Sequence, residues 1–102
     1  MRTHVEVEEG IGRVALSGHF TFAALKVFRE ATDPLLADPA VTALHLDLGG
    51  VGHMEASSLG MLLVLREKAA AKGKGLEISA LSPSAALLLE SVHFEHLFRI
   101  VK

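Results

Sequence analysis

The sequence predicts a small α/β domain in which a mixed β-sheet packs against helices. The chain has 102 residues, which fits one compact domain, and we expect a single domain over residues 1–102. Half of the residues are hydrophobic, so a core can form without disulfides or metals. The apolar spacing also switches repeatedly between the two-residue period of strands and the longer period of helices. These switches predict the element order β-β-α-β-α-β-α-β.

The first two elements form a predicted β-hairpin. Val5 and Val7 alternate with charged residues, as in a half-buried strand. After the run EEGIG, Val14 and Leu16 repeat the alternation. We therefore expect two antiparallel strands joined by a tight turn.

A helix is predicted from Phe22 onward, with Thr21 as its cap. Pro34 lies inside this segment and should kink the helix or restart it near Asp33, because proline lacks the backbone N–H. Helical spacing places four apolar residues on one face of this helix: Leu25, Phe28, Ala31 and Leu35.

The run TALHLDL from Thr42 returns to strand alternation. Its leucines share one face, while His45 and Asp47 share the other. The glycine pair that begins at Gly49 is typical of a turn and should end the strand.

Helix-capping residues and the spacing of apolar residues predict the remaining two helices and two strands. A helix should begin near Ser57 and end at Gly73, and the run LEISAL from Leu76 should form a strand. Ser82 precedes a proline and predicts a capped helix, and the run FRIV from Phe98 predicts a last short strand. Strands that alternate with helices imply parallel pairing through right-handed crossovers. The residues expected in the core include Val14, Leu16, Leu46, Leu62 and Ile78.

Composition excludes several classes of protein. The longest apolar run, from Leu59 to Leu65, is far shorter than the roughly 18 residues of a membrane span, so we expect no membrane insertion. The first ten residues lack the apolar segment of a signal peptide, and the chain has no cysteine, which together predict a cytoplasmic protein. A net charge of −2 argues against nucleic acid binding.

The histidines offer a weak metal signal. His93 and His96 stand three positions apart in a predicted helix, near Glu90 and Glu95. A metal site needs more ligands than this pair supplies, so we expect solvated or half-buried histidines and no metal.

No catalytic or cofactor motif is complete. His45 and Asp47 can share a strand face, but no serine or cysteine nucleophile has the accompanying signature. The runs GGVGH and KGKGL lack the glycine spacing of phosphate-binding loops and are interpreted as turns. We therefore expect neither an enzyme nor a cofactor.

Ser57 and Ser58 lie between Glu55 and an apolar run, and the residues alone leave two interpretations open. Serine is a preferred helix cap, because its oxygen accepts a bond from an unpaired backbone N–H. A hydroxyl at a helix start is also well placed to carry a phosphate, because the free N–H groups and the helix dipole stabilise an anion there.

This region carries a resemblance to a known family. The segments VALSGHFTFAAL, VTALHLDLGGV and HMEASSLGMLLVLREKAAAKGKGLEI resemble the STAS domain of sulfate transporters and anti-sigma factor antagonists, over nearly the whole chain. The family motif reads Asp-Ser-Ser, then Gly or Ala, then Leu-Gly. The matching run begins at Glu55 and ends at Gly60, and the phosphorylated second serine of the motif falls on Ser57.

The resemblance implies a partner-switching regulator. Unphosphorylated, such a domain binds an anti-sigma factor that is also a serine kinase; phosphorylated, it releases it, and a PP2C-type phosphatase resets it. Ser57 is the implied acceptor and Ser58 the fallback. In this sequence Glu55 stands where the family has Asp, Ala56 replaces the first serine, and Thr21 replaces an aspartate of the partner-facing surface. The implied partner-binding residues are Thr21, Glu55, Ala56, Ser57, Ser58 and Leu59.

Two functional classes remain open. The first is a phosphorylation-controlled anti-sigma factor antagonist. The second is a constitutive STAS interaction subunit of a lipid-transport or stressosome-type complex, in which the serine is not used. A neighbouring gene for a GHKL-type kinase or a phosphatase would favour the first, and transporter genes would favour the second. The oligomeric state does not follow from the sequence.

Overall fold

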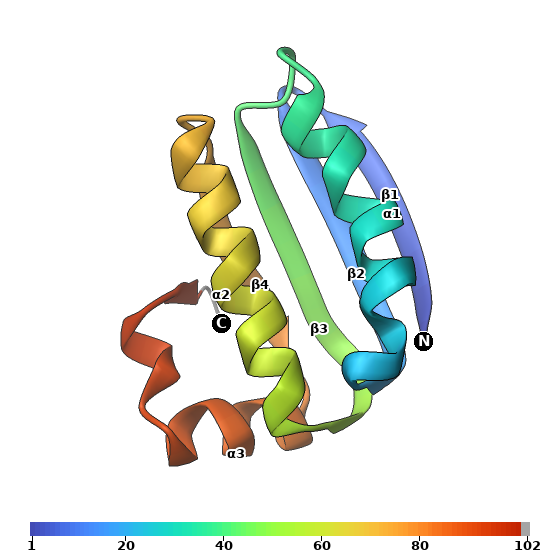
Figure 1. The fold of residues 1–102 in the computed structure, drawn as a ribbon, viewed down its shortest axis with the longest axis vertical. Helices are drawn as coiled ribbons and strands as arrows, with labels where there is room; N and C mark the ends of the chain where they lie inside the picture. The colour runs from blue at the N-terminus through green and yellow to red at the C-terminus, as the bar shows by residue number, and fades with distance from the viewer. Residues whose placement is uncertain (101–102) are drawn as a thin grey trace.

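The computed structural model describes residues 1–100, except for the side chain of Glu95. One five-stranded sheet has the spatial order β1-β2-β3-β4-β5 (Figure 1). β1 is antiparallel to β2, and every other neighbouring pair is parallel. The strands are β1 (Arg2–Glu8), β2 (Ile11–Phe20), β3 (Ala43–Met54), β4 (Gly75–Leu81) and β5 (Arg99–Ile100).

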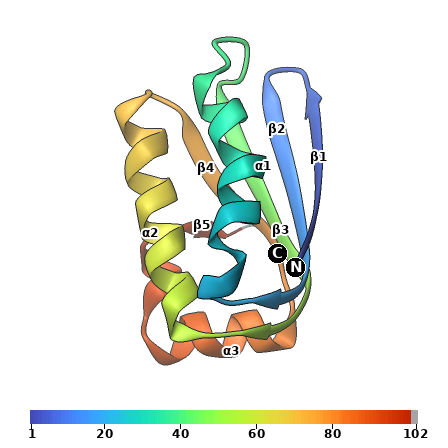
Figure 2. The same cartoon turned by 45° about the vertical axis from the view of Figure 1, so that its right-hand side comes forward.

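The helices gather mainly on one side of this sheet. Figures 1 and 2 show α1 and α2 side by side over one face, and α3 across one end of the molecule. The predicted element order is confirmed, with two short 3₁₀ helices in addition. The helical elements are η1 (Phe22–Ala24), α1 (Leu25–Ala37), α2 (Ala56–Ala71), α3 (Pro83–Ser91) and η2 (Phe94–His96).

The core lies between the sheet and the helices that cover it. In each strand every second side chain points toward the helices. The apolar face of α2 is buried against these side chains. The five residues predicted in the core are confirmed, because none has more than 1% of its surface exposed: Val14, Leu16, Leu46, Leu62 and Ile78.

The prediction that the third strand ends at Gly49 is wrong, because β3 continues to Met54. Its second half still pairs with β2, with Gly50 opposite Ser17 and Met54 opposite Phe20, across shifts in register. A Cβ atom on Gly50 would lie only 2.9 Å from the Cβ of Ser17. The glycine pair therefore permits a close approach of two strands and does not form a turn.

Of the two effects predicted for Pro34, a restart of the first helix near Asp33 is wrong, because α1 is one helix with Pro34 inside it, and a kink stays a prediction. The buried apolar face of α1 packs on the sheet on both sides of the proline. The C-terminal end has a further support, since the ammonium of Lys74 donates to the carbonyl of Leu35 over 3.0 Å and to that of Asp38. Tertiary contacts thus hold the helix together where one backbone bond is missing.

The side chains of β1 are more exposed than the predicted half-buried strand would have them. Val5 and Val7 are 40% and 51% exposed, although Val14, which pairs with Val5, is fully buried. β1 is an edge strand of the sheet, and although α1 contacts it, both valines stay partly open to solvent. The predicted strand is confirmed, but its half-buried character is not.

The predicted end of α2 at Gly73 is confirmed. Gly73 has a φ of +69°, a conformation that glycine adopts without strain. Its N–H donates to the carbonyl of Ala70 over 3.0 Å, and the N–H of Lys74 donates to that of Ala69 over 2.9 Å. This pair of bonds is a Schellman motif, which satisfies the last carbonyls of the helix.

The capped third helix is confirmed as well. The Ser82 side chain accepts a hydrogen bond from the N–H of Ala85 over 3.1 Å, and Pro83 is the first helical residue. The last predicted strand is present as β5, while Val101 of the run FRIV lies outside the described residues.

Candidate functional site

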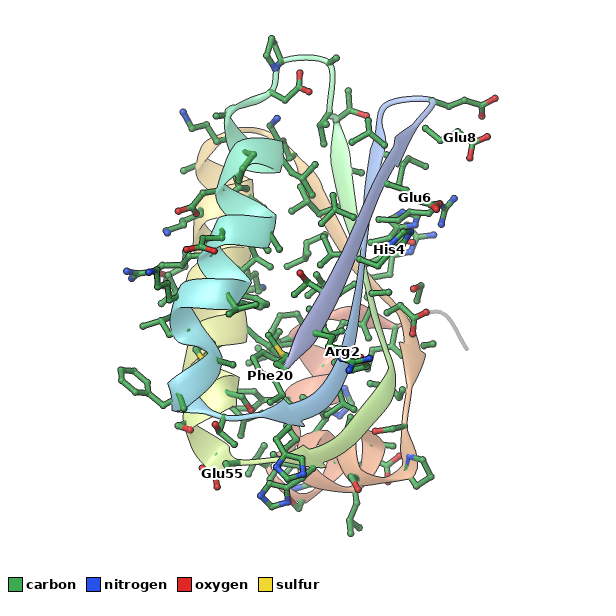
Figure 3. The ribbon with its side chains drawn as sticks, turned by 90° about the vertical axis from the view of Figure 1, so that its right-hand side faces the viewer. Arg2, His4, Glu6, Glu8, Phe20 and Glu55 are labelled. Carbon is green, nitrogen blue, oxygen red and sulfur yellow. The ribbon has the colours of Figure 1, made fainter. Side chains whose placement is uncertain are left out.

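The candidate site forms where two chain segments meet at one end of the sheet. The N–H of Glu55, just after β3, donates to the carbonyl of Phe20 at the end of β2 over 3.3 Å. Figure 3 shows both labelled residues at this end of the molecule, and Figure 1 shows α1 and α2 starting there. The extended β3 therefore delivers the start of α2 to the start of η1.

Ser57 is exposed and occupies the second position of α2. Its Oγ accepts a hydrogen bond from the backbone N–H of Phe22 over 3.2 Å. The prediction that a helix begins near Ser57 is confirmed, since α2 begins at Ala56. The interpretation of the serines as a helix cap is wrong, because the cap position is Glu55 and no side chain makes a capping bond there. The hydroxyl of Ser57 instead satisfies the first N–H of the neighbouring η1.

Ser58 has a different environment from Ser57. It is completely buried, and its hydroxyl donates to the carbonyl of Glu55 over 2.5 Å. The backbone N–H of Ser58 donates to the same carbonyl over 3.0 Å. This serine closes the first turn of α2, while Ser57 faces outward.

The other predicted site residues flank Ser57. Ala56 is exposed, whereas Leu59 is only 6% exposed and packs in the core. The carboxylate of Glu55 lies 3.5 Å from the Nε2 of His53, with both side chains more than half exposed. The structure therefore brings the negative charge of Glu55 and the hydroxyl of Ser57 to the same end of the molecule.

Thr21 occupies the cap position of η1, but its side chain makes no capping hydrogen bond. Its backbone is extended, and its carbonyl accepts the N–H of Ala24 over 2.9 Å. The predicted position is confirmed and the predicted capping bond is wrong. Ser57, from another element, supplies an acceptor to η1 instead.

A groove opens between α1 and α2 beside Ser57, with a volume of about 300 Å³. Its rim carries two exposed apolar side chains, since Phe22 is 63% exposed and Val64 45%. Arg29 and Lys68 also line it, and the Lys68 ammonium lies 3.5 Å from a carboxylate oxygen of Asp33. The groove thus combines a mainly apolar surface with cationic side chains, a combination suited to contact with another molecule.

Sequence reasoning missed Phe22 and this groove. Phe22 meets Ser57 across 35 positions of the chain, and the groove needs side chains from both α1 and α2. A local pattern carries no information on such a contact. The only sequence feature that could have pointed to the groove is Phe22 itself, an aromatic residue directly after the predicted site residue Thr21.

The histidines predicted to be solvated or half-buried do not lie on one α-helix. His93 has a left-handed backbone, with a φ of 57°, and His96 ends the short η2. Within residues 1–100, no group of three or more His, Cys, Asp or Glu side chains could hold a metal ion. The side chain of Glu95 lies outside the described part of the chain.

His45 belongs to a row of charged side chains across the sheet. The guanidinium of Arg13 donates to its Nδ1 over 3.3 Å, and its Nε2 lies 3.3 Å from a carboxylate oxygen of Glu77. Because a guanidinium can only donate, the proton of a neutral His45 is on Nε2. Asp47 instead accepts the N–H of Gly49 over 2.8 Å. The two residues therefore do not form the orienting pair of a catalytic triad.

Among the described helices, none combines the length and the apolar character that a membrane span requires.

Comparisons with known proteins point to one family. Residues 4–102 match the profile of the family described as "Mlab, STAS domain". A STAS-domain containing protein of Pseudomonas aeruginosa (strain UCBPP-PA14) is 31% identical over 87 residues, which are 85% of this chain and 84% of that protein.

Solved structures share the fold at lower identity. An anti-sigma factor antagonist from Mycobacterium paratuberculosis matches with a TM-score of 0.86 and 24% identity, over 98% of this chain and 84% of that one. The Bacillus cell fate determinant SpoIIAA in its phosphorylated form matches with a TM-score of 0.74 and 16% identity, over 99% and 92%. The STAS domain of a SulP transporter from Vibrio cholerae gives 0.67 and 20%, over 90% and 71%.

Proposed function

Because the chain belongs to the STAS domain family, we propose that it is an anti-sigma factor antagonist whose binding is switched by phosphorylation of Ser57. Unphosphorylated, it binds an anti-sigma factor that is also a serine kinase, and the phosphorylated form releases this partner. A PP2C-type phosphatase hydrolyses the phosphate ester and restores binding. The fold alone does not carry this proposal, since one fold hosts many functions.

The observation that carries the proposal is the position of the Ser57 hydroxyl between two helix starts. Ser57 is exposed at the second residue of α2, and its Oγ accepts the first N–H of η1 over 3.2 Å. N–H groups at a helix start favour an anion. The acceptor oxygen is therefore open to a kinase, and its surroundings tolerate the charge that a kinase would add.

Burial favours Ser57 over the fallback Ser58 as the acceptor. Ser58 has no exposed surface, and its hydroxyl is bonded to the carbonyl of Glu55. A kinase would have to open the first turn of α2 to reach it. Phosphorylation of Ser57 needs no such opening: its Oγ forms the bond to the γ-phosphorus of ATP, the hydroxyl proton leaves, and ADP is released.

The charge of the phosphate would cause release of the partner. A phosphoserine carries about −1.5 to −2 charges at neutral pH. It would stand in the groove that Ser57 and the exposed Phe22 line, two positions along the chain from the acidic Glu55. A partner that covers this groove would have to remove water from that charge, which weakens the complex while the domain stays folded.

The test is phosphorylation and binding with the cognate anti-sigma factor kinase. With Mg-ATP, we expect one phosphate, which fragment mass spectrometry should locate on Ser57. Ser57→Ala should bind the kinase as wild type does, and Ser57→Glu should bind weakly. Ser58→Ala should retain both phosphorylation and binding.

Ser84 provides a matched control, because it is also exposed at the second position of a helix, α3. Ser84→Glu should bind as wild type, which separates the effect of position 57 from that of any charge at a helix start. If Ser57→Glu binds as tightly as wild type and no phosphate appears on Ser57 or Ser58, the switch is wrong. The protein would then be a constitutive interaction subunit.

A further inference from the structure

β1 leaves one whole edge of the sheet open. It has a single neighbour, β2, with which all seven of its residues pair without a shift in register. Figure 3 looks onto this edge, and no other element stands in front of β1. On the open side, alternate residues present backbone N–H and C=O groups that have no strand partner among residues 1–100.

This edge lacks two of the devices that prevent pairing between proteins, a proline and a β-bulge. Its sequence RTHVEVE contains no proline, and the regular pairing with β2 contains no bulge. On the side of the helices, Val5 and Val7 are 40% and 51% exposed. A second strand placed along this edge would cover both valines.

The charges of β1 complement one another when the strand is turned end for end. In an antiparallel pair centred on Val5, Arg2 faces Glu8 of a second copy, and His4 faces Glu6 of that copy. The labelled side chains of Arg2, His4, Glu6 and Glu8 all point to the face away from α1 (Figure 3). The opposite charges of Arg2 and Glu8 would stabilise the pair across the two strands. The His4 imidazole, which contacts Glu6 of its own strand over 2.9 Å, can also hydrogen-bond to the Glu6 that faces it.

No neighbouring register of the same kind shares this property. A two-fold axis perpendicular to the sheet keeps side chains of one face together, so the centre can shift only by whole residues. Centring the pair on His4 would still place Arg2 opposite Glu6, but it would oppose two histidines and leave Val7 and Glu8 unpaired. Centring it on Glu6 would oppose two glutamates. The charges together with the number of paired residues therefore favour the register centred on Val5, in which all seven residues of β1 are paired.

We propose that β1 is a self-association surface, through which two copies of this chain form a symmetric dimer by antiparallel pairing centred on Val5. The two sheets would join into one, with the helices of both copies on the same face. One strand pair buries less surface than the roughly 1,600 Å² of a standard interface. The dimer is therefore weak and depends on protein concentration, and it uses neither Ser57 nor the groove.

The first experiment tests the register by charge reversal in the full chain without a tag, followed by sedimentation equilibrium. Arg2→Glu alone places like charges at both ends of the pair, as does Glu8→Arg alone. Each variant should dimerise about tenfold more weakly than wild type. An equimolar mixture of the two should recover the wild-type affinity, because every reversed residue then faces its opposite charge.

The second experiment tests the centre of the pair. Val5→Lys would bring two lysines face to face and should abolish the dimer, with circular dichroism unchanged because this side chain is already 40% exposed. Val92→Lys is the matched control, since Val92 is 41% exposed and lies outside β1, and it should leave the dimer intact. The proposal is overturned if wild type stays monomeric at millimolar concentration. A dimer that survives Val5→Lys, or a mixture that recovers nothing, would also overturn it.

Discussion

The backbone N–H of Phe22 donates a hydrogen bond to the side-chain oxygen of Ser57 over 3.2 Å. This bond joins the starts of η1 and α2, which belong to distant parts of the chain. Any change at the Ser57 hydroxyl therefore acts on both elements, and on the groove between α1 and α2 that Ser57 lines.

Acidic substitutions should distinguish the two serines by stability. Ser57→Glu should change the free energy of unfolding by less than about 1 kcal/mol, because an exposed acid near a helix start is favourable. Ser58→Glu should lower the free energy of unfolding by about 3 kcal/mol or more, because it buries a charge without a partner. Urea denaturation of both variants measures the difference. Equal stabilities would contradict the burial of Ser58.

Two glycines should respond in opposite ways to alanine. A Cβ atom on Gly60, inside α2, meets no atom within 4 Å, so Gly60→Ala should raise the free energy of unfolding by roughly 0.5 to 1 kcal/mol. A Cβ on Gly50 would lie 2.9 Å from that of Ser17, so Gly50→Ala should destabilise by about 1 to 3 kcal/mol. Thermal melts of the two variants should move in opposite directions. A stabilising Gly50→Ala would mean that β2 and β3 are less close.

Lys74 should contribute more to stability than the neighbouring Lys72. Lys74→Met removes the two hydrogen bonds to the carbonyls of Leu35 and Asp38 and should cost roughly 1 to 3 kcal/mol. Lys72 is exposed, so Lys72→Met should stay within about 0.5 kcal/mol of wild type. Denaturant midpoints compare them directly. Similar losses in both variants would show that the charge of this segment matters, and not the bonds to α1.

Among the charged side chains that contact one another across the sheet, substitution of Glu77 should reduce the stability most. This row consists of Arg13, His45, Glu77 and Arg99. The Glu77 carboxylate contacts both His45 and Arg99, and its side chain is only 22% exposed. Glu77→Ala should therefore cost roughly 1 to 2 kcal/mol, because it leaves His45 without this partner. Arg99→Ala should cost less than about 0.5 kcal/mol, since its side chain is 78% exposed. A larger loss at Arg99 than at Glu77, measured by urea denaturation, would contradict this order.

Local pattern was sufficient for the element order and for the core. The alternation around Val14 and Leu46 and the Schellman end at Gly73 depend on neighbours within a few residues, where backbone geometry and burial act directly. The likeness to the STAS family added Ser57 as the expected acceptor, which the residues alone could not separate from a helix cap.

Tertiary contacts decided the rest. The pairing with β2 carried β3 past Gly49, and Lys74 supports the end of a helix that continues through Pro34. The same folding placed Phe22 against Ser57 and left the edge of β1 open. Such outcomes depend on residues that are distant in sequence and near in space, where packing and pairing outweigh the local preference of a single proline or glycine.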